Sequence, residues 1–436
     1  MLAALALPAA ARTRPHYGGT LRVEVEGDPW QQARRLIFDG LTRIGADGNV
    51  RPALAVRWES ENNDHRWQFW LRTGVHFHDG SALTSAAVVE SLNNLCGANC
   101  PWAAVRAVGS SVVFTGDSPM PNLPALLAGD QLLIVAGFNA NGETSPMRPL
   151  IGTGAFQPEG VSNGVFSLTA NDASWEGRPF LDRIEIAGHK SIRDQWLDLS
   201  VGRADLVEVP AEQLRQAREQ RLTVVASPPV SLLALAVAGS GALANPNLRA
   251  AIALAVDRGA LSNVIFQKQG EIAASLLPSA LTGYSFLFSA DRDLNKTRAL
   301  RGGLTSPPLT LSTDGGEAMQ LAAQRIALNL REAGFNVQTA GAPQHGDLVL
   351  LRLTLATSQP QAALESLLRA AGVATPVLAS DPAGLFQAER EFLDTHTLIP
   401  LLYLPRAYAF GGRVRDLRLG PDGTPLLAGI SLQDTP

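Results

Sequence analysis

Two neighbouring stretches decide how this chain folds, Arg51-Pro-Ala-Leu-Ala-Val-Arg-Trp-Glu59 and Phe69-Trp-Leu-Arg-Thr-Gly-Val-His-Phe-His-Asp-Gly-Ser-Ala-Leu-Thr84. Residues 67–72 are predicted to form a strand because aromatic and apolar residues dominate the run. Gly74 then turns the chain into a short strand at residues 75–78, and a second turn follows at Asp79-Gly80. We expect a helix after Thr84, whose side chain would cap it.

Before this region, residues 19–26 alternate apolar and polar side chains as a half-buried strand does. Residues 36–44 are apolar and are predicted to be helical, with a turn cluster at residues 45–48.

After it, strands and helices alternate in the βαβα order of an α/β protein. The first such unit is predicted at residues 184–186, 192–199, 204–209 and 211–220, and the second at residues 309–313, 317–333 and 335–339. Gly315-Gly316 precede the helix of the second unit, where backbone N–H groups can hold an anion, although a plain turn explains them equally well.

Length and composition agree with two lobes. The chain has 436 residues, more than the roughly 250 to 300 at which a single core stops growing. Hydrophobic residues make up 46% and charged residues 17%, and the net charge is -4, so neither disorder nor a nucleic-acid partner is indicated. Pro and Ser interrupt the pattern at residues 225–231 and 394–400, which are candidate crossings between the lobes.

The N-terminus indicates export. Residues 1–11 form a short apolar run in which Ala9 and Ala11 have the spacing that signal peptidase prefers. We predict that residues 1–16 are a signal peptide, truncated at its start because the usual positive charges are absent. No later apolar run reaches the ~18 residues that a membrane helix needs, so we expect an exported, soluble protein without direct membrane insertion. Cys96 and Cys100 flank a tight loop, and an oxidising compartment would favour a disulfide between them.

The two stretches quoted first resemble the signature segments of the extracellular solute-binding proteins of family 5, which bind peptides, nickel and related solutes. Further segments resemble that family in the same order along the chain: Gly152-Thr-Gly-Ala-Phe156, Trp175-Glu-Gly-Arg-Pro-Phe-Leu-Asp-Arg-Ile184, Val201-Gly-Arg-Ala-Asp-Leu206, Asn247-Leu-Arg-Ala-Ala-Ile-Ala-Leu-Ala-Val-Asp-Arg258 and Ile399-Pro-Leu-Leu-Tyr403.

This resemblance implies an α/β, two-lobed periplasmic-binding-protein clamp of type II, cluster C-like, with mixed sheets and a hinge. Lobe I would comprise residues 17–238 and 397–436, and lobe II residues 239–396. The implied function is that of the substrate-binding component of an ABC importer, which captures a small solute by hinge closure and delivers it to permease subunits in the inner membrane. The alternative is a ligand-sensing module for a chemoreceptor or sensor partner.

Four residues are candidate ligand contacts. Trp30, Tyr284 and Phe286 are placed where the family's ligand contacts tend to lie, although each side chain can equally well belong to the core. Peptide binders of the family carry a "W-x-x-D-Y-x-D-P"-like segment, and here Leu353 to Pro360 takes its place, with Ala356 at the position of the first Asp. Without that carboxylate we expect a free α-amine to bind poorly, and Arg352 would favour an anionic ligand.

We expect no cofactor and no enzymatic activity. The chain lacks Gly-x-Ser-x-Gly and a plausible Cys-His pair for nucleophilic catalysis. His76 and His78 have a spacing that a metal site can use, but they lie in the family's "F-H-D-G" turn, so we favour a structural role for them.

Overall fold

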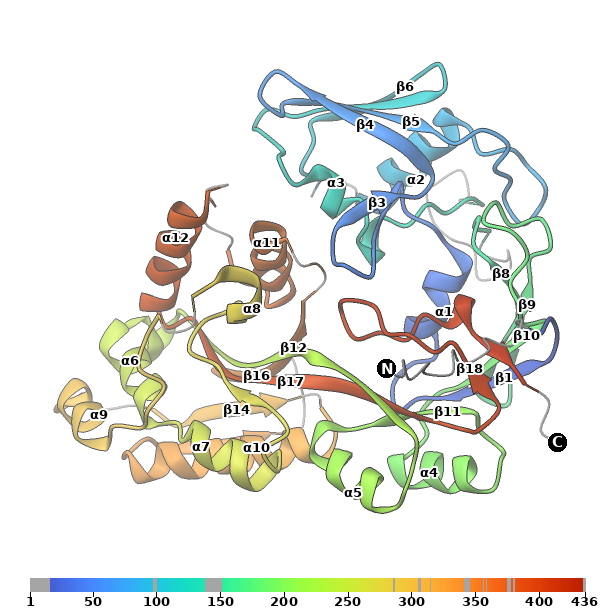
Figure 1. Ribbon diagram of the computed structural model, residues 1–436. Coiled ribbons are helices and arrows are strands. Elements are labelled where there is room, and N and C mark those ends of the chain that lie inside the picture. The colour runs from blue at the N-terminus through green and yellow to red at the C-terminus, as the bar shows by residue number, and fades with distance from the viewer. Residues whose placement is uncertain are drawn as a thin grey trace, which may run out of the picture.

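The computed structural model shows two α/β lobes that are connected by one long sheet (Figure 1). The structure describes residues 16–433 apart from 97–99, 138–150, 285–286, 305–306, 314, 341–345, 356, 358, 375–377 and 379–380. The predicted signal peptide therefore lies almost wholly outside the described residues. Within them, no helix combines the length and the apolar character that crossing a membrane requires.

The long sheet has the strand order β15-β14-β16-β12-β17-β11-β1-β10-β9-β8, and β13 pairs with β17. Its strands are β1 (Thr20–Glu24), β8 (Phe156–Ser162), β9 (Val165–Ala170), β10 (Arg183–Ala187), β11 (Leu206–Val209), β12 (Val224–Val237), β13 (Glu271–Ile272), β14 (Leu309–Thr313), β15 (Val337–Ala340), β16 (Leu348–Thr354) and β17 (Leu398–Phe410). The sheet is mixed, since β1, β10 and β11 pair in parallel whereas β12 and β17 pair antiparallel.

The strands β12 and β17 connect the two lobes. Near one end they pair at Val224↔Ala409 and near the other at Ala236↔Leu398, with register shifts around Pro229, which faces Pro405. We infer that the lobes meet near this proline pair. Pro229 lies within residues 225–231, which the sequence suggests as a crossing, whereas Pro405 lies outside residues 394–400.

Helices cover both faces of the sheet in each lobe (Figure 1). In lobe II, alternate residues of β12 point to opposite faces, so Leu233 packs in the core beside α10 (Glu317–Glu332), while Leu232 packs beside α11 (Pro360–Ala370). In lobe I, α1 (Trp30–Ile37) covers one face, and α4 (Ile192–Ser200) and α5 (Leu214–Glu219) cover the other. Within the described residues, the remaining α-helices of four or more residues are α2 (Ser85–Cys96), α3 (Leu123–Leu126), α6 (Pro246–Ala255), α8 (Ser279–Thr282), α9 (Leu294–Arg301) and α12 (Pro382–Asp394).

A separate four-stranded sheet packs on lobe I in the order β4-β5-β7-β6. It comprises β4 (Ala55–Glu61), β5 (Arg66–Leu71), β6 (Ala104–Val108) and β7 (Ser111–Thr115), and it covers α2 and a core of its own that includes Phe69 and Phe114. The predicted strand at residues 67–72 and the capped helix are confirmed, because Thr84 Oγ1 accepts a hydrogen bond from the Ala87 amide at 3.1 Å.

Two local predictions were wrong. Residues 36–44 are not one helix, because α1 ends at Ile37 and a short strand, β2 (Thr42–Ile44), pairs with β3 (Val50–Pro52). Gly40 lies so close to neighbouring backbone that a Cβ there would be 2.6 Å from the Leu127 carbonyl oxygen. The second error is the strand at residues 75–78, which is reduced to a single bridge between His76 and Ala82.

The C-terminal segment lies beside β1 and β11 (Figure 1). There β18 (Val414–Arg415) pairs with β19 (Ser431–Leu432). The buried carboxylate of Asp205, just before β11, accepts hydrogen bonds from Arg22 of β1 and from Arg413 of this segment. These contacts fasten the last residues to the first strand of the lobe.

Candidate functional site

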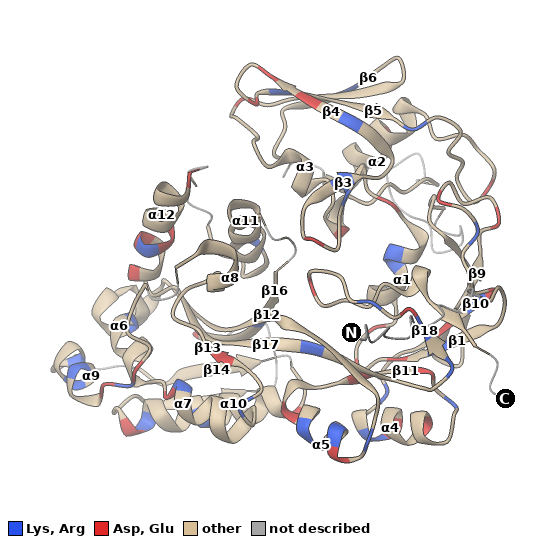
Figure 2. Ribbon diagram, viewed as in Figure 1, with Lys and Arg blue, Asp and Glu red and all other residues tan. Residues whose placement is uncertain are grey.

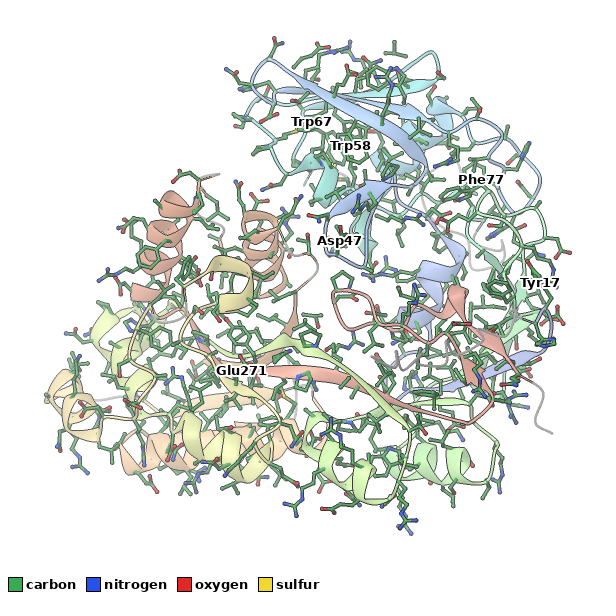
Figure 3. All side chains as sticks on the ribbon, viewed as in Figure 1. Tyr17, Asp47, Trp58, Trp67, Phe77 and Glu271 are labelled. Carbon is green, nitrogen blue, oxygen red and sulfur yellow. A yellow bond between two sulfur atoms is a disulfide. The ribbon has the colours of Figure 1, made fainter. Side chains whose placement is uncertain are left out.

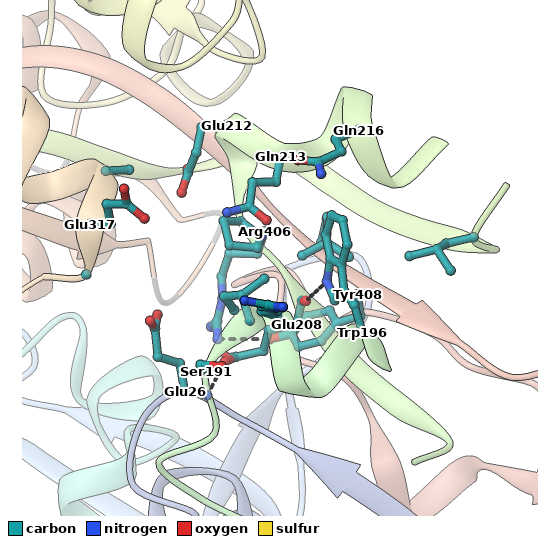
Figure 4. A pocket seen from close by; sticks show the side chains of 18 of the residues that line it. Glu26, Ser191, Trp196, Glu208, Glu212, Gln213, Gln216, Glu317, Arg406 and Tyr408 are labelled. Carbon is teal, nitrogen blue, oxygen red and sulfur yellow. Dashed lines mark hydrogen bonds between the residues drawn. The ribbon is translucent and has the colours of Figure 1, made fainter. Parts of the chain in front are cut away.

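The candidate site is a cavity of about 1090 Å³ between the two lobes, beside the crossing strands (Figure 4). Lobe I contributes residues from α4 and from the segment that links β11 to α5, while lobe II contributes the start of α10 and the end of β16. A cavity of this size holds a small organic solute.

Two glutamates at strand ends form one side of the cavity in lobe I. Glu26 follows β1 and Glu208 lies in β11, and these strands are parallel neighbours, so their carboxyl ends share one edge of the sheet. The Glu26 amide donates a hydrogen bond of 2.6 Å to Glu208 Oε2. Burial raises the pKa of Glu208, and the hydrogen bond from Glu26 opposes that shift.

Aromatic side chains extend this side of the cavity. Trp196 of α4 donates from Nε1 to the backbone oxygen of Glu208 at 3.1 Å, which holds the helix against the strand end. Tyr408 of β17 accepts a hydrogen bond of 2.9 Å at its hydroxyl oxygen from Arg406 Nη2. Burial raises the pKa of Tyr408 to about 12, so its hydroxyl stays protonated at neutral pH.

In lobe II, the side of the cavity comes from alternating residues of adjacent strands. Arg352 and Thr354 both line the cavity from β16, and Ser231 of β12 faces Thr354 in the register. Arg352 Nη2 donates to the backbone oxygen of Pro405 at 3.3 Å. Burial lowers the pKa of Arg352, and the carboxylates of Glu212 and Glu208 act against that shift.

This arrangement suits reversible binding. The cavity combines aromatic surface with a few carboxylates, guanidinium groups and hydroxyls, which is the composition of a pocket that orients a polar solute. Among the described residues, no group of three or more His, Cys, Asp or Glu side chains is placed to hold a metal ion.

The structure places the four candidate ligand contacts in different surroundings. Arg352 lines the cavity. Trp30 packs edge-on against Phe38 and Phe166 beside the core of lobe I, and it is not among the residues that line the cavity. Phe286, like Ala356, lies outside the described residues.

Tyr284 is held by a buried carboxylate in lobe II. Its hydroxyl donates a 2.6 Å hydrogen bond to Glu389 Oε2, and its ring packs edge-on against Phe386. Burial raises the pKa of Tyr284, and the hydrogen bond to Glu389 adds to that shift. Glu389 also accepts hydrogen bonds from the amides of Leu276 and Leu277, so it organises this loop.

The turn that contains His76 and His78 is part of the scaffold. His78 Nδ1 accepts a hydrogen bond from the Gly152 amide at 3.3 Å, and Nε2 pairs with the Gly154 carbonyl oxygen at 3.1 Å. Burial lowers the pKa of His78, in keeping with the neutral ring that this bonding requires. The glycines are needed because a Cβ on Gly152 or Gly154 would lie 1.9 or 2.3 Å from a carbonyl oxygen at the end of α1.

In the structure Cys96 and Cys100 are joined as a disulfide at the end of α2, with their Cα atoms 5.3 Å apart. The cysteines lie beside the core under the four-stranded sheet and far along the chain from the residues that line the cavity.

Sequence reasoning missed the glutamates of the cavity: Glu26, Glu208, Glu212 and Glu317. A usable signal existed, because each lies at or just after a predicted strand or at the start of a predicted helix. Ligands of α/β proteins commonly bind beyond the carboxyl ends of the strands, so charged residues at those positions are candidates.

The fold defines the class: two α/β lobes joined by crossing strands are the fold of the periplasmic binding proteins. The chain matches the model of bacterial extracellular solute-binding proteins, family 5 (middle region), over residues 49–373, and it belongs to that family.

Solved structures share the fold across nearly the whole chain. NikA of Staphylococcus aureus, in complex with Ni(L-His)2, has 16% sequence identity and a TM-score of 0.78 over 95% of this chain and 100% of that chain. AppA of Bacillus subtilis, in complex with a nonapeptide, has 17% identity and a TM-score of 0.82 over 97% and 100%. AgaA of A. tumefaciens R10, in complex with agropinic acid, has 20% identity and a TM-score of 0.83 over 96% and 99%.

Curated relatives match a shorter region. YhjP of Bacillus subtilis is 32% identical over 159 residues, which are 34% of this chain and 26% of YhjP. The HTH-type transcriptional regulator SgrR of Yersinia pestis is 31% identical over 159 residues, which are 35% of this chain and 28% of SgrR. The chain thus spans little more than a quarter of the length of these relatives.

Proposed function

We propose that this protein is the solute-binding component of an ABC importer, and that it captures a small organic solute between its lobes and delivers it to permease subunits. The observation that carries the proposal is the cavity of about 1090 Å³, lined by both lobes beside the two strands that connect them. Rotation of one lobe about these strands would open and close the cavity. The protein would act in the periplasm, without catalysis and without a cofactor.

Two contacts across the cleft support a clamp that closes on its ligand. Thr357 of lobe II donates a hydrogen bond of 3.2 Å from Oγ1 to the carbonyl oxygen of Gly48 in lobe I, and Thr357 is buried there. Glu26 of lobe I approaches the start of α10 in lobe II, where a Cβ on Gly316 would lie 3.2 Å from Glu26 Oε1. Both contacts would separate when the lobes open.

Native mass spectrometry of the freshly purified protein tests this proposal. A solute retained at one per chain and lost on denaturation is the expected result. Small-angle scattering should then show a smaller radius of gyration with the released solute added back than without it. A protein that retains nothing, and whose scattering does not change with any candidate solute, would count against the clamp.

A second candidate is a ligand-sensing module for a chemoreceptor or sensor partner. The match to the transcriptional regulator SgrR favours it, because that relative is named as a regulator. Uptake of the labelled solute by cells with and without the gene separates the two: a transport component is required for uptake, whereas a sensor changes a downstream response and leaves uptake intact.

A further inference from the structure

Three carboxylates from three separate segments converge on one part of the cavity. Glu26 follows β1, Glu212 precedes α5 and Glu317 begins α10, so the first two belong to lobe I and the third to lobe II. Figure 4 shows the side chains of Glu212 and Glu317 pointing into a common space, with Glu26 at its lower edge.

The charges of Glu26 and Glu317 affect the pKa of Glu212. Burial raises the pKa of this carboxyl, the charge of Arg352 opposes the shift, and the negative charges of Glu26 and Glu317 add to it. None of the three carboxylates forms an ion pair with any described residue. Of the arginines that line the cavity, Arg406 is bonded to Tyr408 and Thr424 and Arg352 to the Pro405 carbonyl. Arg193 also lines the cavity, without an ion pair to these carboxylates among the described residues.

The helix terminus offers an alternative explanation for two of these carboxylates. Negative side chains are stabilised near the start of a helix, and both Glu26 and Glu317 lie at the start of α10. However, within the described chain no amide of the first turn of α10 donates to Glu26, and Glu212 lies on the opposite lobe. The helix therefore does not account for all three carboxylates.

A second observation points independently to a ligand. Ser231 lines the same cavity, is only 1% exposed, and its hydroxyl has no hydrogen-bond partner in the part of the chain that the structure describes. A buried hydroxyl without a partner is costly, and a polar group of a ligand would satisfy it.

We propose that the cavity binds an organic cation, a solute with an ammonium or guanidinium group that is held by Glu26, Glu212 and Glu317 while another polar group reaches Ser231. This assignment rests on the proposed solute-binding function and names its ligand class. Because Glu317 lies on lobe II and the other two carboxylates on lobe I, the cation would relieve their repulsion in the closed clamp. Ligand binding and closure would thereby be coupled.

The assignment changes the expectation for Arg352. From the sequence, Arg352 was predicted to favour an anionic ligand. In the structure, the negative charges of Glu212 and Glu208 act on the positive charge of Arg352. Anionic solutes would meet the three carboxylates on entering the same space.

Isothermal titration calorimetry with three probes of similar length tests the proposal: agmatine, which carries an ammonium and a guanidinium group, adipate, which carries two carboxylates, and neutral 1,6-hexanediol. Agmatine should bind, and the Glu212→Gln and Glu317→Gln variants should each weaken it by roughly 10- to 100-fold, as expected for the loss of a charge-assisted hydrogen bond. Glu219→Gln is the matched control, because Glu219 lies exposed on α5 and pairs with Arg215 outside the cavity.

A measurement without ligand makes the test independent of the choice of probe. Since Glu212→Gln removes a buried negative charge that lies near those of Glu26 and Glu317, the ligand-free Glu212→Gln protein should melt at a higher temperature than the unmodified protein, whereas Glu219→Gln should not. The assignment fails if agmatine does not bind at millimolar concentration, if its affinity is the same in all variants, or if the melting temperature of Glu212→Gln does not rise. Tight binding of adipate or hexanediol would also overturn it while leaving the solute-binding function standing.

Discussion

Replacing Asp205 by alanine should destabilise lobe I by about 3 kcal/mol. The Asp205 carboxylate is almost completely buried and accepts five hydrogen bonds. Arg413 donates at 2.6 and 2.7 Å, and Arg22 donates from its backbone at 2.9 Å and from its side chain at 3.1 and 3.2 Å. The change would therefore release the first strand and the C-terminal segment together.

The magnitude follows from what the substitution leaves behind. Breaking a buried ion pair costs about 3 to 5 kcal/mol when the remaining charge stays buried. Here the side chains of Arg22 and Arg413 are 36% and 30% exposed, so water can solvate them and the low end of that range applies. For a lobe of about 200 residues, 3 kcal/mol corresponds to a fall of roughly 6 to 12 °C in Tm.

Thermal unfolding followed by circular dichroism measures this shift. Asp172→Ala is the matched control, because Asp172 also pairs with an arginine but its side chain is 80% exposed, so Tm should stay unchanged. Burial acts to raise the pKa of Asp205, but the hydrogen bonds from Arg413 and Arg22 prevail and hold it below its usual range. The contribution of Asp205 is thus present above about pH 4 and lost as the pH falls through its folded pKa. Equal melting temperatures for the two variants would refute the reasoning.

Three further predictions concern the scaffold. Gly154→Ala should lower Tm, because the new Cβ would lie 2.3 Å from a backbone oxygen at the end of α1. Gly303→Ala is the control and should leave Tm unchanged, because a Cβ at Gly303 would have nothing within 4 Å. Similar melting curves for the two variants would contradict this prediction. The pKa of His78 is lowered by burial, so its contribution to stability should be complete above about pH 6.5 and should fall as the pH drops below that value; urea titrations at several pH values should show a shallower dependence in His78→Asn. Tyr284→Phe should lower the urea midpoint through loss of its bond to Glu389 while solute affinity is retained, and a large loss of affinity at unchanged stability would instead identify Tyr284 as a ligand contact.

Much of the fold follows from short-range patterns in the sequence. The strands β1, β5, β10, β11 and β14 and the helices α4 and α10 are found close to their predicted positions. Each has a strong apolar period and a clear stop or cap, such as Ser191, whose side chain caps α4. The end of α1 could not be predicted in this way, because the carbonyl oxygen of Ile37 at that end accepts a hydrogen bond from the Gly154 amide, which lies far along the chain.

The cavity was harder to predict for a related reason. Its carboxylates range from Glu26 to Glu317, and no local pattern links residues that only the two lobes bring together. Aromatic residues were ambiguous as well: Trp30 has the same apolar character whether it packs in a core or lines a pocket, and the structure places it against Phe38 and Phe166. Arg352, by contrast, lies near the end of β16, and its side chain lines the cavity.

The proline pair at the crossing has a mechanical consequence. Pro228, Pro229 and Pro405 have no backbone N–H, so the strands β12 and β17 have fewer donors to offer where they pass between the lobes. A bend at this point breaks few interstrand hydrogen bonds, whereas the ladders on either side stay intact and keep each lobe rigid. We expect the free energy of opening to be set mainly by the contacts across the cleft rather than by the backbone of the connection. Substituting the prolines would restore backbone donors at the crossing and make the lobes harder to separate, while the residues that line the cavity stay the same.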